Sequence, residues 1–202
     1  MFAWINIVLL LICAFAILLL YVQSASPEAR EQLTGDPDSF RFCGVLRKVS
    51  IVPMAISSAC YVAYCFAPLP VPLPVHFPWL WTTSILLGLL IISISSCIVM
   101  VGVLAAGKEA LEPQKDGALY EGIYKKIRHP QFYEVFSWFG FALLLHSPFL
   151  FLFSFIYVPI WVLMVQAEER DLILRFGTPY VEYYRRTGAL IPRTKTKTGK
   201  IS

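Results

Sequence analysis

Charged residues are scarce in this chain. Lys, Arg, Asp and Glu make up 15% of its 202 residues, whereas 57% are hydrophobic; soluble globular proteins carry roughly 25% charge. Such a composition has too few polar residues to cover an aqueous surface, so we expect lipid as the main solvent. The polar stretches are too short to bury a core of their own. This excludes a separate soluble domain and predicts a single membrane domain over residues 1–202, with no nucleic-acid partner.

Metal-binding spacings are also missing. The chain has five cysteines but no CxxC pair and no Cys/His cluster, and four of the five lie in apolar stretches. We therefore interpret them as small buried hydrophobes and expect no metal site and no disulfide. The cysteines are Cys13, Cys43, Cys60, Cys65 and Cys97.

Long apolar stretches dominate instead. At ~1.5 Å per residue, a helix of about 20 residues crosses a ~30 Å hydrocarbon core. We expect an all-α integral membrane protein with about five transmembrane helices and a cytoplasmic C-terminal helical segment. The predicted spans are Phe2–Val22, Gly44–Ala67, Trp79–Ala106 and a shorter hairpin of Phe132–Leu145 and Phe149–Val165. Phe2–Val22 has no preceding Lys or Arg and exceeds a usual signal-peptide core, which favours a retained helix over a cleaved signal.

The basic residues predict the orientation. All 17 Lys and Arg lie in or beside Gln23–Lys48, Gly107–Arg128 or the region after Gln166. With five crossings these segments fall on one side, which the positive-inside rule makes cytoplasmic. We expect the N-terminus outside and the C-terminus inside. Three N-terminal helices (1–106) would precede a functional core (107–193) and a mobile basic tail (194–202).

Local breakers refine this outline. Pro53 should kink the second span, and Pro68–Pro78, with its alternating prolines, should be an extended connection. Ser26 and Pro27 are typical of a helix start, with Ser26 as cap. Gly177 should end the last membrane helix. Thr178 should then cap a helix whose Tyr180, Tyr183 and Tyr184 form one aromatic face, which we interpret as packing.

The most polar internal stretch is Asp116–Tyr133, DGALYEGIYKKIRHPQFY. It combines glycines, tyrosines, a basic run and His129-Pro130 directly before an apolar span. A spaced pair of motifs then stands out. Gly122-x-Tyr124-x-x-x-Arg128-His129-Pro130-x-Phe132 is followed by Glu168-Glu169-x-x-x-x-x-Phe176-Gly177-x-x-Tyr180-x-x-Tyr183.

This pattern resembles the isoprenylcysteine carboxyl methyltransferase and phospholipid methyltransferase family of integral membrane enzymes, over roughly Gly107 to Arg193. The resemblance implies S-adenosylmethionine as cofactor and a lipophilic or prenylated acceptor that enters from the bilayer. It places His129, Arg128 and Glu168 in the catalytic centre. The implied cofactor-binding residues are Asp116, Gly117, Ala118, Leu119, Tyr124, His129, Pro130, Gln131, Phe132 and Glu168.

Three positions depart from the family pattern. Phe132 replaces the usual Tyr and so lacks a hydroxyl, although Tyr133 is adjacent. Asp116 stands where family members often have His. Met164 stands where the eukaryotic carboxyl methyltransferases carry a substrate-binding arginine, which weakens a prenylcysteine carboxylate as the acceptor.

The residue chemistry is compatible with this cofactor. A carboxylate such as Glu168 pairs with the ammonium of S-adenosylmethionine, and aromatic faces stabilise its sulfonium by ~0.5–2 kcal/mol each. Backbone N–H groups of a Gly-containing loop bind a carboxylate. A carboxylate acceptor needs no base, whereas an amine acceptor needs one, with His129 or Glu168 as candidates. Arg128 is a candidate for holding an anionic acceptor.

Two other functions fit the same features. Membrane reductases of the sterol-reductase type share a related C-terminal architecture, and that reading predicts NADPH binding. A non-enzymatic membrane scaffold would bind neither cofactor. In that case His129-Pro130 is only a helix start and Glu168-Glu169 only a solvated helix exit.

Overall fold

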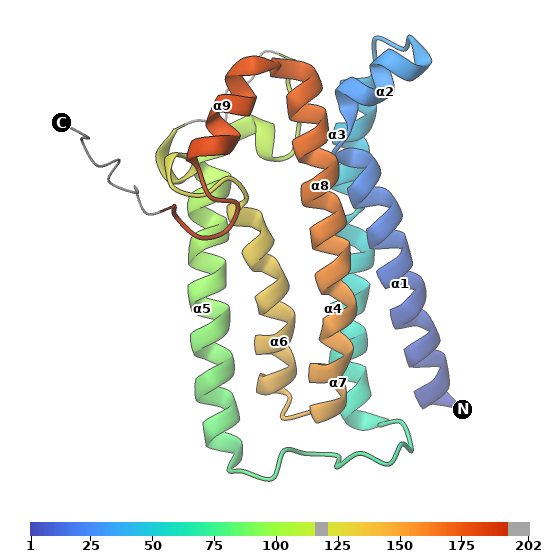
Figure 1. Ribbon diagram of the computed structural model, residues 1–202. Helices are drawn as coiled ribbons and strands as arrows, with labels where there is room; N and C mark the ends of the chain where they lie inside the picture. The colour runs from blue at the N-terminus through green and yellow to red at the C-terminus, as the bar shows by residue number, and fades with distance from the viewer. Residues whose placement is uncertain (116–120, 194–202) are drawn as a thin grey trace, which may run out of the picture.

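The computed structural model describes residues 1–115 and 121–193 (Figure 1). Within these ranges every regular element is a helix, and one isolated bridge pairs Ile127 with Gly188. The predicted all-α class is therefore confirmed. The α-helices are α1 (Phe2–Ser24), α2 (Pro27–Thr34), α3 (Ser39–Val49), α4 (Ile51–Phe66), α5 (Trp81–Ala106), α6 (Glu134–Leu144), α7 (Pro148–Phe153), α8 (Tyr157–Phe176) and α9 (Thr178–Arg186). The 3-10 helices are η1 (Gly107–Ala110), η2 (Gly122–Lys125), η3 (Pro130–Tyr133) and η4 (Ser154–Ile156).

The N-terminus lies at one end of the bundle and α9 at the other (Figure 1). Four helical stretches are long and apolar enough to cross a membrane: Phe2–Ser24, Ser39–Phe66, Trp81–Ala110 and Pro148–Phe176. Their apolar side chains face outward to a large extent; on α5, Leu86 is 69% and Leu104 73% exposed. Lipid solvates such a surface, whereas water does not. Helix α6, which was expected to form part of a fifth span, has only 11 residues and is not one of these four stretches.

The breakers act mostly as predicted. Ser50 separates α3 from α4, three residues before Pro53, whose missing N–H interrupts the helix there. The helix pair starts at Ser39 and not at Gly44, because the polar turn before the apolar stretch is helical as well. Residues 68–80 contain no helix, and they run as an extended segment along the end of the bundle that holds the N-terminus (Figure 1).

Two of the predicted caps are different. Ser26 occupies the N-cap position of α2, but its side chain makes no cap hydrogen bond. The N–H of Ala29 donates to Oδ1 of Asp171 on α8 at 2.9 Å, so a carboxylate from 142 residues away satisfies this helix start. At α9 the N-cap is Gly177, with φ of 59°, and not Thr178. Gly177 adopts the left-handed backbone that ends α8 and starts α9 in one turn.

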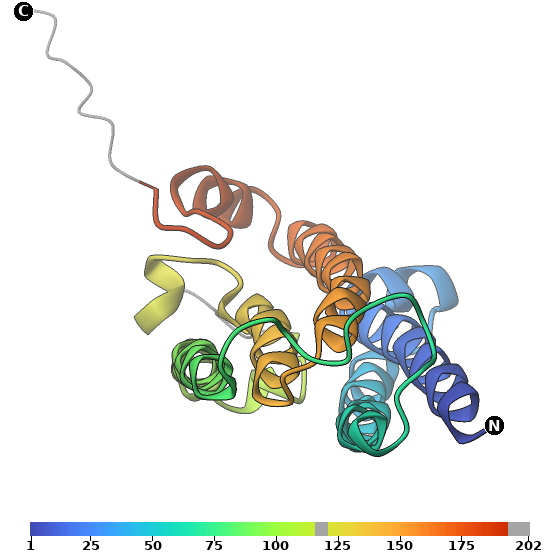
Figure 2. The ribbon, with the colours of Figure 1, turned by 90° about the horizontal axis from the view of Figure 1, so that it is seen from below.

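The core lies where α1, α4, α6, α7 and α8 meet, as the view along the bundle shows (Figure 2). Large aromatic side chains fill it: the ring of Trp138 stacks on Tyr157 at 4.3 Å, and Tyr61 lies 5.3 Å from Trp138. Helix α5 approaches this group through α6. A Cβ on Gly88 would lie 2.7 Å from the carbonyl oxygen of Gly140, so glycine at both positions permits this close crossing.

Candidate functional site

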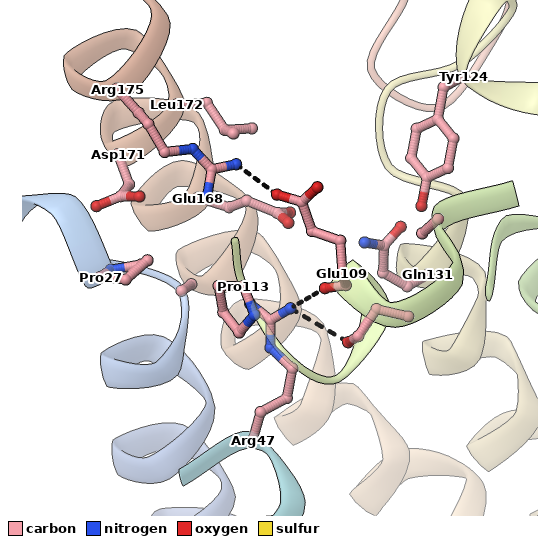
Figure 3. Close-up of a pocket in the computed structure, with 13 residues that line it drawn as sticks. Pro27, Arg47, Glu109, Pro113, Tyr124, Gln131, Glu168, Asp171, Leu172 and Arg175 are labelled. Carbon is pink, nitrogen blue, oxygen red and sulfur yellow. Dashed lines mark hydrogen bonds and ion pairs between the residues drawn. The ribbon is translucent and has the colours of Figure 1, made fainter. Parts of the chain in front are cut away.

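A polar cavity lies at the end of the bundle opposite the N-terminus, between α8 on one side and η2 and η3 on the other. Its α8 wall carries Glu168, Asp171 and Arg175, one above the other on one face of the helix (Figure 3). Tyr124 and Gln131 form the opposite wall (Figure 3). The remaining lining residues are Ala25, Pro27, Arg47, Ala106, Glu109, Ala110, Pro113 and Leu172.

Residues 107–115, which we call the strap, cross this cavity from the end of α5. Oε1 of Glu109 accepts from Nη2 of Arg175 at 2.7 Å, in an ion pair whose side chains are 10% and 4% exposed. Arg175 also donates to the carbonyl of Gln114 at 2.9 Å. From below, Arg47 donates to the carbonyls of Glu109 and Ala110, each at 3.2 Å (Figure 3). Two arginines thus hold the strap closed over the cavity.

His129 ties the two sequence motifs together. Its Nδ1 lies 3.1 Å from Oε2 of Glu168, and its Nε2 lies 2.9 Å from Oε1 of Glu169. The ring is 1% exposed. Burial alone would lower the pKa of His129, but its hydrogen bonds and ion pairs with the two glutamates outweigh burial and raise it above the ordinary value. The raised pKa favours the imidazolium form, in which both ring nitrogens donate to the carboxylates.

Arg128 is held equally firmly. Its Nε and Nη2 donate to Oε1 of Glu169 at 3.0 and 2.7 Å. Its Nη1 donates to the carbonyls of Tyr184 and Thr187, and its guanidinium lies 4.0 Å above the Tyr184 ring. These donors point at α9 and at Glu169, so the described contacts fix the guanidinium in place. Arg128 is not among the residues that line the polar cavity.

The structure separates the predicted site residues into three groups. Tyr124, Gln131 and Glu168 line the cavity. His129 stands behind Glu168 and fixes that carboxylate. Pro130 and Phe132 are packed: a Cβ on Gly102 of α5 would lie 2.6 Å from Cγ of Pro130, and Phe132 belongs to the main core. Asp116, Gly117, Ala118 and Leu119 lie outside the described residues.

The hydroxyl considered as a substitute for the missing one on Phe132 is already used. Tyr133 donates it to the carbonyl of Leu190 at 3.0 Å, which holds the segment after α9. Met164, at the position of the family's arginine, is 3% exposed and belongs to the main core. Neither residue lines the polar cavity.

Tyr124 and Gln131 give the wall opposite α8 its hydrogen-bonding groups, and both side chains are neutral. The side-chain oxygen of Gln131 is buried and has no hydrogen-bond partner among the described residues. Burial raises the pKa of Tyr124 well above its ordinary value, so its phenol stays protonated. The backbone carbonyl of Tyr124 accepts from the hydroxyl of Tyr183 at 2.7 Å, which fixes η2 against α9.

Sequence reasoning missed several lining residues. Asp171 and Arg175 follow Glu168 at i+3 and i+7, so helical periodicity alone places all three on one face of α8. Arg47 and Glu109 have no such signal, because they reach the cavity from α3 and from the strap. Comparisons with protein-family models, with curated proteins and with solved structures found no match to this chain.

Proposed function

We propose that this protein is an integral membrane methyltransferase that uses S-adenosylmethionine, related to the isoprenylcysteine carboxyl and phospholipid methyltransferases. The supporting observation is the contact between His129 and Glu168. It joins two motifs that lie about forty residues apart, and it does so at the edge of a cavity lined by Tyr124 and Gln131. A scaffold has no need for a carboxylate that is held by a histidine beside a buried amide oxygen without a partner among the described residues.

The donor set fits this cofactor chemically. The Glu168 carboxylate is placed to pair with an ammonium group, and the ring of Tyr124 offers a face to a sulfonium. The unpartnered oxygen of Gln131 offers a hydrogen-bond acceptor to an adenine amino group. When bound, the cofactor supplies an electrophilic methyl group. The protein then contributes binding and alignment, which govern an in-line displacement.

The strap must open before the cofactor binds. The polar cavity has a volume of about 20 Å³, which is room for about one water molecule. Opening breaks the Glu109–Arg175 ion pair and releases the two carbonyls that Arg47 holds. The strap thus acts as a cover for the cofactor, which reaches it from the side of the bundle that carries the basic segments. We place that side in the cytoplasm and the N-terminus outside.

Binding of S-adenosylhomocysteine to purified protein tests this proposal. We expect saturable binding that Glu168→Gln weakens about 10-fold or more, because a charge-assisted pair with the cofactor ammonium is lost. Glu182→Gln, an exposed glutamate on α9, is the matched control and should bind as the unmodified protein does. NADPH is titrated in parallel. Binding of NADPH without S-adenosylhomocysteine would favour a reductase, and binding of neither would favour a scaffold.

A further inference from the structure

Glu134, the first residue of α6, lies where two further cavities meet. One cavity of about 210 Å³ shares Arg47, Ala110, Tyr124 and Gln131 with the polar cavity and reaches down to Glu134. The other, of about 450 Å³, starts at Glu134 and runs between α4 on one side and α5 and α6 on the other. The two cavities share Ile51, Met54 and Glu134 in their walls.

The larger cavity is an apolar groove. Apart from Glu134, its polar residues are Ser58 and Ser137, and both hydroxyls are already used: Ser58 donates to the carbonyl of Met54 at 3.1 Å, and Ser137 bonds to Ser95 at 2.9 Å. Its volume lies within the ~300–1,000 Å³ of small-molecule sites. Ile51 on its wall is 53% exposed on the lipid-facing surface, so the groove reaches the region occupied by acyl chains.

The carboxylate of Glu134 has no hydrogen-bond or ion-pair partner among the described residues. The other charged residue around these two cavities is Arg47, which directs its guanidinium to the carbonyls of Ser24, Glu109 and Ala110. A position in the first turn of a helix favours a negative charge. That explains why a glutamate is tolerated there, but it does not explain why an acidic side chain lies at the head of an apolar groove.

We propose that Glu134 binds the head group of the methyl acceptor, and that the acceptor is an amphiphile with a cationic amine head and an apolar tail. This inference rests on the proposed function, since the groove leads to the proposed cofactor cavity. The tail lies in the groove between α4 and α6. The ammonium lies against Glu134, beside Gln131 on the adjoining turn, at the mouth of the polar cavity. A carboxylate head would gain no ion pair with Glu134 at this point.

Direct binding of three matched single-chain probes to the full-length protein in nanodiscs, measured by native mass spectrometry at pH 7, tests this inference. The probes are tetradecylamine, tetradecanol and tetradecanoate. We expect the amine to bind about 10- to 100-fold more tightly than the alcohol, because it adds a charge-assisted hydrogen bond in an apolar site. Glu134→Gln should remove this preference and leave alcohol binding unchanged. Ser58→Ala, in the same groove, should keep it.

Two results would overturn the inference: no preference for the amine in the unmodified protein, or a preference that survives in Glu134→Gln. The first of these needs no variant, so the test stands even where Glu134→Gln fails to fold. Titration with S-adenosylhomocysteine on the same samples separates this inference from the proposed function. Normal cofactor binding without amine preference refutes only the acceptor class. Amine preference without cofactor binding refutes the methyltransferase and supports the Glu134 site.

Discussion

Replacing His129 by Phe tests whether this residue holds the two ends of the site together. The substitution keeps an aromatic ring but removes both nitrogens, which leaves Glu168 without its hydrogen-bond partner among the described residues and Glu169 with Arg128 alone. Removing one partner of a buried ion pair costs about 3–5 kcal/mol, because the other charge stays buried. For a chain of about this size, each kcal/mol shifts the Tm by ~2–4 °C, so we expect the Tm to fall by roughly 6–20 °C.

The assay is thermal unfolding of the purified protein in detergent, followed by intrinsic fluorescence. His76→Phe is the control, because His76 is an exposed histidine at the far end of the bundle. The double variant His129→Phe/Glu168→Gln should regain part of the loss, since it no longer buries an unpaired charge; coupling between contacting residues is typically about 0.5–3 kcal/mol. A fall of less than about 2 °C in the single variant, or strict additivity, would refute this account of the pair.

Three further expectations concern stability. The raised pKa of His129 means that its stabilising charge is fully present below its ordinary value of about 6.5 and is lost as the pH rises through the folded-state pKa; the Tm should therefore fall over that range, and His129→Phe should flatten the profile. Gly88→Ala places a Cβ 2.7 Å from the Gly140 carbonyl and should cost about 1–3 kcal/mol in chemical denaturation; an unchanged midpoint would contradict the crossing. Tyr183→Phe removes the 2.7 Å hydrogen bond to Tyr124 and should cost about 0.5–1.5 kcal/mol by the same measurement, with no loss contradicting that bond.

The fold was predictable because its determinants are local. Hydropathy marks the long helices, and single residues mark their ends. Gly177 ends α8 through its left-handed backbone, and His146–Pro148 forms the turn between α6 and α7 as expected, with Ser147 accepting from the N–H of Leu150. The exact starts were less predictable. The cap of α2 comes from Asp171 on α8, a contact that exists only once the chain is folded.

The site was predictable only in part. The motif pair correctly brought His129 to Glu168. Glu169, however, also had a plain reading as a solvated helix exit, and the structure shows it bonded to both His129 and Arg128. Arg128 was expected at the chemistry, and its described contacts run to Glu169 and to α9. Such distinctions depend on which way a side chain points, and spacing along the sequence does not encode that direction when the partners lie on different helices.

The strap and Glu134 were the features furthest from sequence reasoning. Glu109 reaches Arg175 across 66 residues, and nothing in the local sequence of either residue indicates the other. In the sequence, Glu134 is an acidic residue at the start of an apolar stretch. Its place at the head of an apolar groove depends on the packing of α4 against α6, which periodicity does not specify.

A structure of the protein with S-adenosylhomocysteine bound is the most direct test of the central claim. The account predicts ligand density between the α8 wall and Tyr124, with the ligand's amino group at Glu168, the strap displaced and the Glu109–Arg175 pair broken. It also predicts that the segment containing Gly117 converges on the same ligand. Density at another place on the protein, or an unchanged closed strap at saturating ligand, would contradict it.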